Sequence, residues 1–281
     1  MAVGVDTRSC GPEADVSRRF ELFLFSTDPA AILPAVSGGV AGLVVDWERV
    51  GKRHRQAGAD TQIGEDTVED LRRVRACTSA RILCRIDNRE ALLDEQVDAA
   101  VASGADEILL PMVRSADEVE RVLDEARGRV GVGILVETEA VLGELREIAA
   151  LPISRAYLGL NDLAIDRGTT NIFDPLVDGT LEEVRSSFSV PFGVAGLTVA
   201  DRGVPIPCRL IVGELIRLDC AFTFLRRSYH ADIRGRDPAH EIPRLLAALE
   251  AASRRSADQV DQDRDELIAA VEQWTGVLTS V

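Results

Sequence analysis

The chain has 281 residues, of which 46% are hydrophobic and 28% are charged. These proportions are ordinary for a folded globular protein, and the length is ample for one large α/β core. The 47 acidic and 32 basic residues give a net charge of −15, and a field of that sign repels nucleic acids and anionic membrane surfaces. We therefore expect neither as a partner.

The start of the chain carries no sign of a targeting segment. Residues 1–20 lack the apolar core of a signal peptide, and no apolar run in the chain approaches the ~20 residues needed to span a bilayer. We expect a cytoplasmic protein whose residues 1–18 form a flexible N-terminal tail. The five cysteines are scattered and form no CxxC pair, which argues against a zinc site or a disulfide framework.

Apolar runs of strand length recur from residue 20 onward, and helical patterns separate most of them. The runs alternate little between apolar and polar residues, which is typical of strands buried on both faces in a parallel sheet. They are FELFLF (20–25), GLVVD (42–46), RILCRI (81–86), DEILLP (106–111), GVGILVE (131–137), RAYLGL (155–160), PFGVAG (191–196) and AFTFLR (221–226). This order predicts a (β/α)8 TIM barrel over residues 19–250, with extra C-terminal helices. An open doubly wound sheet is the alternative, but no GxGxxG or P-loop sequence follows the first strand.

Three segments between or after the strands carry further signals. EAVLGELREIAA (139–150) has apolar residues at helical spacing and is expected to form one helix. Ser115 followed by Glu118 is a capping-box pattern at the start of another helix. The polar segment 51–66 follows the second strand, and we interpret it either as a substrate-contact loop at the barrel rim or as a solvated linker.

The last helix is predicted over residues 251–281. Its apolar stripe is larger than closing a barrel requires, and we expect it to pack on a neighbouring subunit, with packing on its own barrel as the alternative. The stripe consists of Leu267, Ile268, Val271, Trp274, Val277 and Leu278.

Acidic residues follow two strands that are consecutive in the chain. The run VGILV leads into Glu137, and AYLGL leads into Asn161 and Asp162. Parallel neighbouring strands would place both acids at one rim of the barrel. Either acid alone would more often cap the following helix. Together they predict a site for Mg²⁺ or Mn²⁺, which prefer hard oxygen ligands.

Arg85 interrupts the otherwise apolar run RILCRI. A buried arginine is costly unless it is paired or solvated. It therefore either pairs with Asp46 or Asp87, or contacts a ligand at the barrel mouth, and we favour the ligand. Asp46 and Glu48 follow the second strand and would hold metal-bound waters or orient Arg85. The other strand-end residues of interest are Arg49, Met112 and Ala195. All three histidines lie outside the predicted strands, so we do not expect a histidine-rich zinc site.

Several motifs occur together and in order: GLVVDWE, RILCRIDN, GADEILLPMVRSADEVE, ILVETEAVLGELREIAA and YLGLNDLAIDRG. They resemble the HpcH/HpaI aldolase and citrate lyase beta-subunit family, a metal-dependent (β/α)8 group of the phosphoenolpyruvate/pyruvate-barrel superfamily. The resemblance implies that Glu137 and Asp162 bind the metal. It implies that Arg85 contacts the carbonyl oxygen of a 2-oxo acid and that the backbone amides of Asn161 and Asp162 hold its carboxylate. Arg49, Met112 and Ala195 are expected beside the substrate.

The activity that this resemblance implies is that of a carbon–carbon lyase of the aldolase or decarboxylase type, acting through a metal-stabilised enolate. The aldolase branch has DGEH where this chain has Asp46-Trp47-Glu48-Arg49, and arginine cannot act as a base near neutral pH. A metal-bound water, Glu48 or a loop residue would have to replace the histidine. The alternatives are a CoA-ester lyase or thioesterase acting on an acyl-CoA, and a non-catalytic barrel that binds a metal or a carboxylate. The resemblance also implies a homo-oligomer, a trimer or a hexamer.

Overall fold

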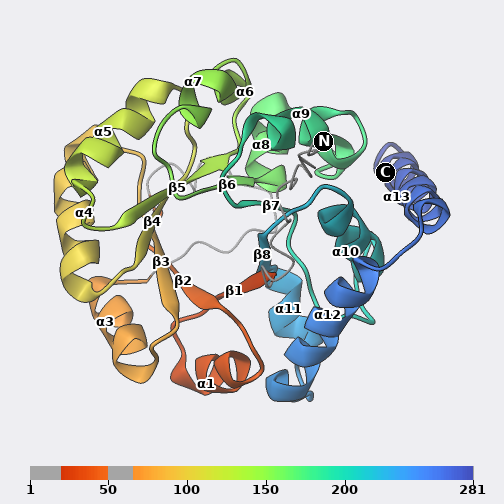
Figure 1. Cartoon of the computed structure of the whole chain (residues 1–281), viewed down its shortest axis with the longest axis horizontal. Coiled ribbons are helices and arrows are strands. Elements are labelled where there is room, and N and C mark those ends of the chain that lie inside the picture. The colour runs from red at the N-terminus through yellow and green to blue at the C-terminus, as the bar shows by residue number, and fades with distance from the viewer. Residues whose placement is uncertain (1–19, 50–65, 281) are drawn as a thin grey trace, which may run out of the picture.

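The computed structural model describes residues 20–49 and 66–280 and contains a closed barrel of eight parallel strands in the order β1 to β8 (Figure 1). The strands are β1 Glu21–Phe25, β2 Gly42–Asp46, β3 Arg81–Arg85, β4 Glu107–Leu110, β5 Gly131–Val136, β6 Arg155–Leu158, β7 Phe192–Val194 and β8 Phe222–Leu225. Each strand pairs with the next in the chain, and β8 pairs with β1. The predicted (β/α)8 TIM barrel is confirmed.

The helices form a ring outside the barrel (Figure 1). They are α1 Pro29–Ser37, α3 Val68–Cys77, α4 Glu90–Ser103, α5 Ala116–Ala126, α6 Glu139–Leu142, α7 Leu145–Ala149, α8 Leu160–Arg167, the 3₁₀ turn η1 Asp174–Leu176, α9 Thr180–Ser187, α10 Cys208–Arg217, α11 Arg227–Asp232, α12 Pro238–Ala252 and α13 Ala257–Leu278. No helix in the described part of the chain is both long enough and apolar enough to cross a bilayer.

Successive residues of each strand face opposite sides of the barrel wall, which explains the unalternating apolar runs. One set of side chains fills the barrel interior, and the other packs against the helices. The interior set is Phe23, Val44, Leu83, Leu109, Leu135, Tyr157, Phe222 and Phe224. The interior is therefore a packed core, and ligands must bind at its rim.

A buried ion pair lies at the end of the barrel where the strands begin. The Arg155 side chain is 4% exposed, and its Nε donates to Oε1 of Glu107 at 2.7 Å. Its guanidinium also lies over the rings of Phe23 and Phe222, 4.8 and 4.6 Å from their centroids. In (β/α)8 barrels this end contributes to stability, whereas chemistry takes place at the opposite end.

Two local predictions between the strands were wrong. The segment 139–150 forms two short helices, α6 and α7, because Gly143 ends the first and the Glu144 carboxylate turns away to accept the N–H of Ala116 at 3.2 Å. Ser115 does begin α5, but no side-chain cap bond forms there. The Glu118 carboxylate accepts the N–H of Arg114 at 2.8 Å instead, so the capping box is absent.

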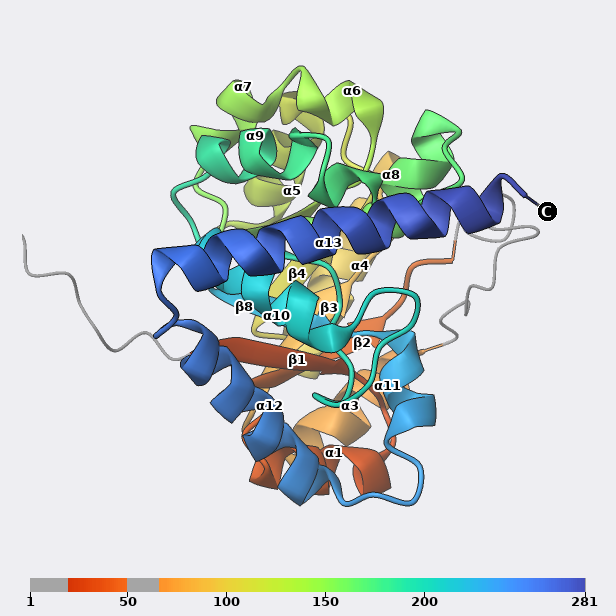
Figure 2. The same cartoon turned by 90° about the vertical axis from the view of Figure 1, so that its right-hand side faces the viewer.

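The C-terminal helix α13 runs along the outside of the barrel, beside α10 (Figure 2). Its Leu267 and Val271 are buried in the main core. Arg264 donates to Oε1 of Glu214, on α10, at 2.7 Å, so this helix packs on its own barrel. Val277 is 46% exposed, and contact with a neighbouring subunit stays a prediction. The predicted tail and residues 51–65 of the predicted loop lie outside the described residues.

Candidate active site at the barrel rim

The predicted site residues lie at the barrel rim because side chains alternate between the two faces along each strand. Two residues beyond the interior positions Leu83 and Leu135, the same barrel face continues with Arg85 and Glu137. In the same way Asp46 follows Val44 on β2. The sequence therefore places a cation and two carboxylates over one end of the packed interior.

Arg85 is held by a two-point ion pair. Its Nε donates to Oδ1 of Asp46 at 2.8 Å, and its Nη2 donates to Oδ2 at 2.7 Å. Oε2 of Glu48 lies 3.5 Å from Nε, and the guanidinium lies 5.3 Å from the ring centroid of Phe25. Burial alone would lower the pKa of Arg85, but the negative charges of Asp46 and Glu48 outweigh it and raise the pKa. Of the two alternatives that the sequence leaves open, the ion pair with Asp46 is present.

Asp46 is itself fixed by hydrogen bonds. Its N–H donates to Oδ2 of Asp66 at 2.8 Å, and its Oδ1 accepts the N–H of Glu48 at 3.2 Å. Burial and the nearby negative charge of Asp46 raise the pKa of Asp66. Asp66 was not among the predicted site residues, because it lies 20 positions beyond Asp46 at the end of a polar loop. Asp66 thus holds the backbone of Asp46, whose carboxylate binds Arg85.

Glu137 is a buried carboxylate, 3% exposed, directly after β5. The backbone N–H of Met112 donates to its Oε1 at 2.8 Å. Its Oε2 lies against Gly159, where an added Cβ would come within 2.4 Å of that oxygen. Glycine is required at this position because the carboxylate approaches the backbone so closely. This contact was not predicted, although the glycine is visible in the run AYLGL.

The charges around Glu137 are mainly negative. Burial first, and then the carboxylates of Asp162 and Glu48, raise the pKa of Glu137 to about 8, although Arg85 and the N–H of Met112 partly offset this rise. Asp162 is 8% exposed and lies in the first turn of α8. The carboxylate of Asp162 is thus close enough to Glu137 to raise the pKa of that residue.

The residue types at this site fit a divalent metal ion. Asp46 and Glu48 add two more carboxylates at the same rim, and Asp46 already binds the guanidinium of Arg85. The excess of negative charge is what a hard cation would neutralise. In the described part of the chain no group of three or more His, Cys, Asp or Glu side chains has metal-binding geometry. A metal here would therefore rely on Glu137 and Asp162, with ligand or water oxygens completing its coordination.

The start of α8 is a second feature of the rim. Gly159 is the N-cap, so Asn161 and Asp162 fall in the first helical turn. Backbone N–H groups in a first turn have no partner within the helix, and the helix dipole favours a negative charge there. This arrangement suits the carboxylate of a ligand.

The remaining predicted residues are Arg49, Met112 and Ala195, of which Met112 contacts Glu137 through its backbone N–H. The side chain of Arg49 donates from Nη2 to the carbonyl of Asp66 at 2.8 Å. It also lines, with Trp47, a depression of about 290 Å³ beside α3 and α4, on the outer side of the barrel. Met112 and Ala195 both have left-handed backbone angles, with φ of 52° and 42°. The carbonyl of Ala195 accepts the hydroxyl of Thr223.

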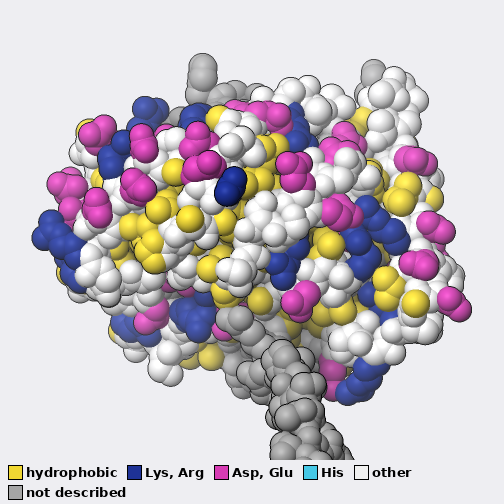
Figure 3. Space-filling model, turned by 45° about the horizontal axis from the view of Figure 1, so that its top comes forward, with side chains coloured by type: hydrophobic (Ala, Val, Ile, Leu, Met, Phe, Trp, Pro, Cys, Tyr) yellow, Lys and Arg dark blue, Asp and Glu magenta, His cyan; other side chains and the backbone are white. Residues whose placement is uncertain are grey.

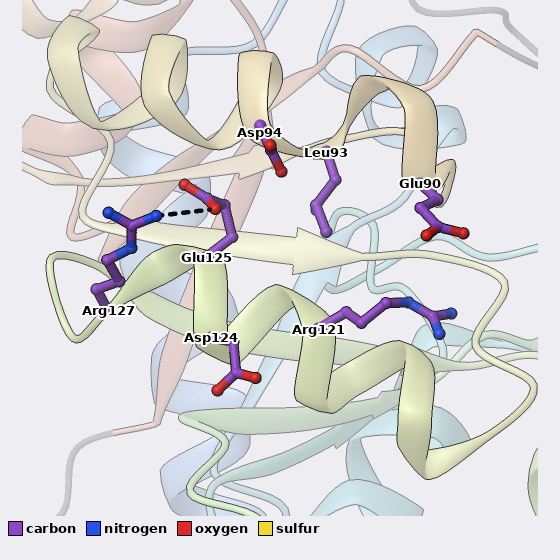
Figure 4. A pocket seen from close by; sticks show the side chains of 7 residues that line it. All are labelled: Glu90, Leu93, Asp94, Arg121, Asp124, Glu125 and Arg127. Atoms are coloured by element: carbon purple, nitrogen blue, oxygen red, sulfur yellow. Dashed lines mark hydrogen bonds and ion pairs between the residues drawn. The ribbon is translucent and has the colours of Figure 1, made fainter.

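A separate depression of about 300 Å³ lies between the outer faces of α4 and α5 (Figure 4). Its lining consists of Glu90, Leu93, Asp94, Arg121, Asp124, Glu125 and Arg127. Arg127 pairs with Glu125 at 3.4 Å. Acidic and basic side chains are interspersed on the face shown in Figure 3. The depression lies between the outer faces of two helices, outside the barrel, and we assign it no part in the site.

The fold and the rim define this protein as a (β/α)8 barrel whose strand ends carry a carboxylate-rich site. The model of the HpcH/HpaI aldolase/citrate lyase family matches residues 19–174. The chain belongs to this family, whose members are typically lyases and generally depend on a divalent metal.

Solved structures with similar folds support the barrel assignment. Citrate synthase SbnG is 17% identical, with a TM-score of 0.55, and the match covers 86% of this chain and 96% of that one. RipC from Yersinia pestis is 15% identical, with a TM-score of 0.51 and coverages of 86% and 99%. A protein from Aquifex aeolicus VF5 is 14% identical, with a TM-score of 0.53 and coverages of 85% and 94%. No curated protein sequence matches the chain.

Proposed function

We propose that this protein is a divalent-metal-dependent carbon–carbon lyase of the aldolase or decarboxylase type that acts on a 2-oxo acid. The observation that carries the proposal is the buried Glu137, whose pKa is raised by burial and by the carboxylates of Asp162 and Glu48. The nearby cation, Arg85, is already bound to Asp46. A Mg²⁺ or Mn²⁺ ion would relieve the remaining repulsion through the oxygen ligands that these ions prefer.

The chain's own residues would bind and orient the substrate. The first-turn amides of Asn161 and Asp162 suit the carboxylate of a 2-oxo acid. A divalent ion held by Glu137 and Asp162 would supply positive charge where the enolate oxygen develops. Arg85 adds a second positive charge there, and its pairing with Asp46 means that it need not reorient as the reaction proceeds.

We assign proton transfer to Glu48. Arg49 stays protonated near neutral pH, and its side chain donates to the carbonyl of Asp66. The carboxylate of Asp46 already accepts hydrogen bonds from Nε and Nη2 of Arg85. Glu48 is the remaining acid at the end of β2, 3% exposed in its side chain and 3.5 Å from Arg85. Its carboxylate is close enough to Glu137 to raise that residue's pKa.

Exchange of the methyl protons of pyruvate with solvent deuterium, followed by NMR, tests the proposal. With Mn²⁺ or Mg²⁺ present, the wild-type protein should exchange these protons and decarboxylate oxaloacetate. If the protein binds the metal but supports neither reaction, the lyase proposal is wrong. Acetyl-CoA titrated in a calorimeter tests the CoA-ester alternative, for which a binding heat is required.

The role of Glu48 is tested by Glu48→Gln, which keeps the size of the side chain and removes its ability to accept a proton. We expect the exchange rate to fall by about 100-fold or more, since a positioned acid–base group typically contributes 10²–10⁴-fold. Mn²⁺ affinity should change little. An exchange rate within about threefold of the wild type would transfer the role to another group.

A further inference from the structure

The loop after β4 contains a strained residue that touches the candidate metal site. Met112 has a φ of 52°, in the left-handed region that L-residues other than glycine rarely occupy. Such a conformation is energetically costly and persists only when its surroundings hold it. Its N–H is the group that donates to Oε1 of Glu137 at 2.8 Å. The strained peptide therefore fixes one oxygen of a proposed metal ligand.

Asn88 and Glu118 hold the next peptide unit, which carries the Met112 carbonyl. Nδ2 of Asn88 donates to the Met112 carbonyl at 3.2 Å and to Oε2 of Glu118 at 2.9 Å. The same Oε2 accepts the N–H of Arg114 at 2.8 Å, and Nη1 of Arg114 lies 3.3 Å from the Met112 carbonyl. The two side chains thus link the start of α4 and the first turn of α5 to the loop between β4 and α5.

These side chains are directed to the loop at the expense of ordinary helix capping. Asn88 lies next to Arg89, the N-cap of α4, and Glu118 lies at the third position of α5, yet neither helix has a side-chain cap bond. A side-chain cap ordinarily stabilises the start of a helix. The sequence places capping residue types at both helix starts, and the fold uses them for the loop instead.

We propose that Asn88 and Glu118 are positioning residues of the metal site. They hold Met112 in its left-handed conformation through its carbonyl, so that its N–H keeps the carboxylate of Glu137 in place at the proposed metal site. The hydroxyl of Thr138 also supports this loop, because it donates to the Val113 carbonyl at 2.6 Å. The inference rests on the proposed function for its metal, but the contact between Met112 and Glu137 can be tested without one.

Four variants test the proposal. Asn88→Ala removes the donor to Met112, and Glu118→Ala removes the acceptor shared by Asn88 and Arg114. Glu118→Gln keeps an oxygen that can accept both bonds and serves as the conservative rescue. Glu120→Ala removes an exposed acid from the same helix and is the matched control.

The first readout is hydrogen exchange at the Met112 amide, measured by NMR in the metal-free protein. We expect exchange at least tenfold faster than wild type in Asn88→Ala and Glu118→Ala, and unchanged in the other two variants. The second readout is Mn²⁺ affinity by calorimetry, which should fall 10- to 100-fold in the two alanine variants, as is typical when groups supporting a metal ligand are lost. The melting temperature monitors general loss of stability.

The outcomes separate this proposal from the proposed function. Wild-type exchange at Met112 in Asn88→Ala overturns the positioning role, whether or not the protein binds Mn²⁺. Faster exchange with unchanged Mn²⁺ affinity also overturns it, because the peptide would then not control the metal ligand. A wild-type protein that does not bind Mn²⁺ refutes the proposed metal dependence and, with it, the role of these residues toward a metal.

Discussion

Replacing Glu137 with glutamine should stabilise the metal-free protein at high pH and abolish its response to metal. The pKa of Glu137 is raised from 4.5 to about 8, so the folded state holds this proton more tightly than the unfolded state. The contribution of the neutral carboxyl to the free energy of unfolding is therefore fully present below about pH 4.5. This contribution is lost as the pH rises through about 8. Since one pKa unit corresponds to about 1.4 kcal/mol, the full effect approaches about 5 kcal/mol.

The assay is urea unfolding of the wild type and Glu137→Gln, with and without MnCl₂, between pH 5 and pH 9. Without metal, the variant should match the wild type near pH 5 and exceed it by about 2–5 kcal/mol at pH 9. Mn²⁺ should stabilise the wild type most at high pH and the variant hardly at all. Glu147→Gln, on the exposed face of α7, is the control. A difference between wild type and Glu137→Gln that does not vary with pH would refute the reasoning.

Three further substitutions test the packing of the site. Asp46→Ala leaves the largely buried Arg85 with the longer contact to Glu48 as its one remaining ion pair among the described residues, and urea unfolding should show a loss of about 3 kcal/mol. Gly159→Ala places a methyl group against Oε2 of Glu137, and calorimetry should show Mn²⁺ binding weakened at least tenfold. Nη2 of Arg226 is buried without a hydrogen-bond partner among the described residues. Arg226→Met should therefore leave the melting temperature unchanged or raise it, whereas a fall of more than about 5 °C, some 1–2 kcal/mol, would show that the guanidinium stabilises the fold.

The barrel was predictable because its signal is local and repeated. Each strand is a short apolar run, and both wall faces are buried, so the runs stand out without any knowledge of the partners. The failures were also local. In the segment 139–150 the apolar spacing is helical, but Gly143 ends α6 and Glu144 bonds to Ala116 of the preceding unit. The periodicity of one segment cannot show that a side chain will form its hydrogen bond with a neighbouring helix.

The site was predictable to the extent that strand ends define it. Glu137 and Asp162 could be paired from the sequence because parallel neighbouring strands end at one rim. The supporting contacts could not, since each joins residues that are distant in the chain. The Glu118 carboxylate accepts a hydrogen bond from Asn88, 30 positions before it, and Asn88 also donates to the Met112 carbonyl. The Asp66 carboxylate accepts the N–H of Asp46, whose own carboxylate binds Arg85. Such links follow from side-chain directions in the folded barrel and leave no pattern in the sequence.

The structure also bears on which group acts as the base, since Arg49 cannot. The sequence leaves open a metal-bound water, Glu48 or a loop residue. The side chain of Arg49 is drawn to the carbonyl of Asp66, whereas Glu48 is buried beside Arg85. The Glu48 carboxylate contributes to the raised pKa of Arg85, so the two side chains interact electrostatically. Proton transfer by Glu48 would thus depend on Arg85, and Arg85→Lys should shift the pH profile of pyruvate exchange as well as lower its rate. A lowered rate with an unshifted profile would separate the two roles and favour the water or the loop residue.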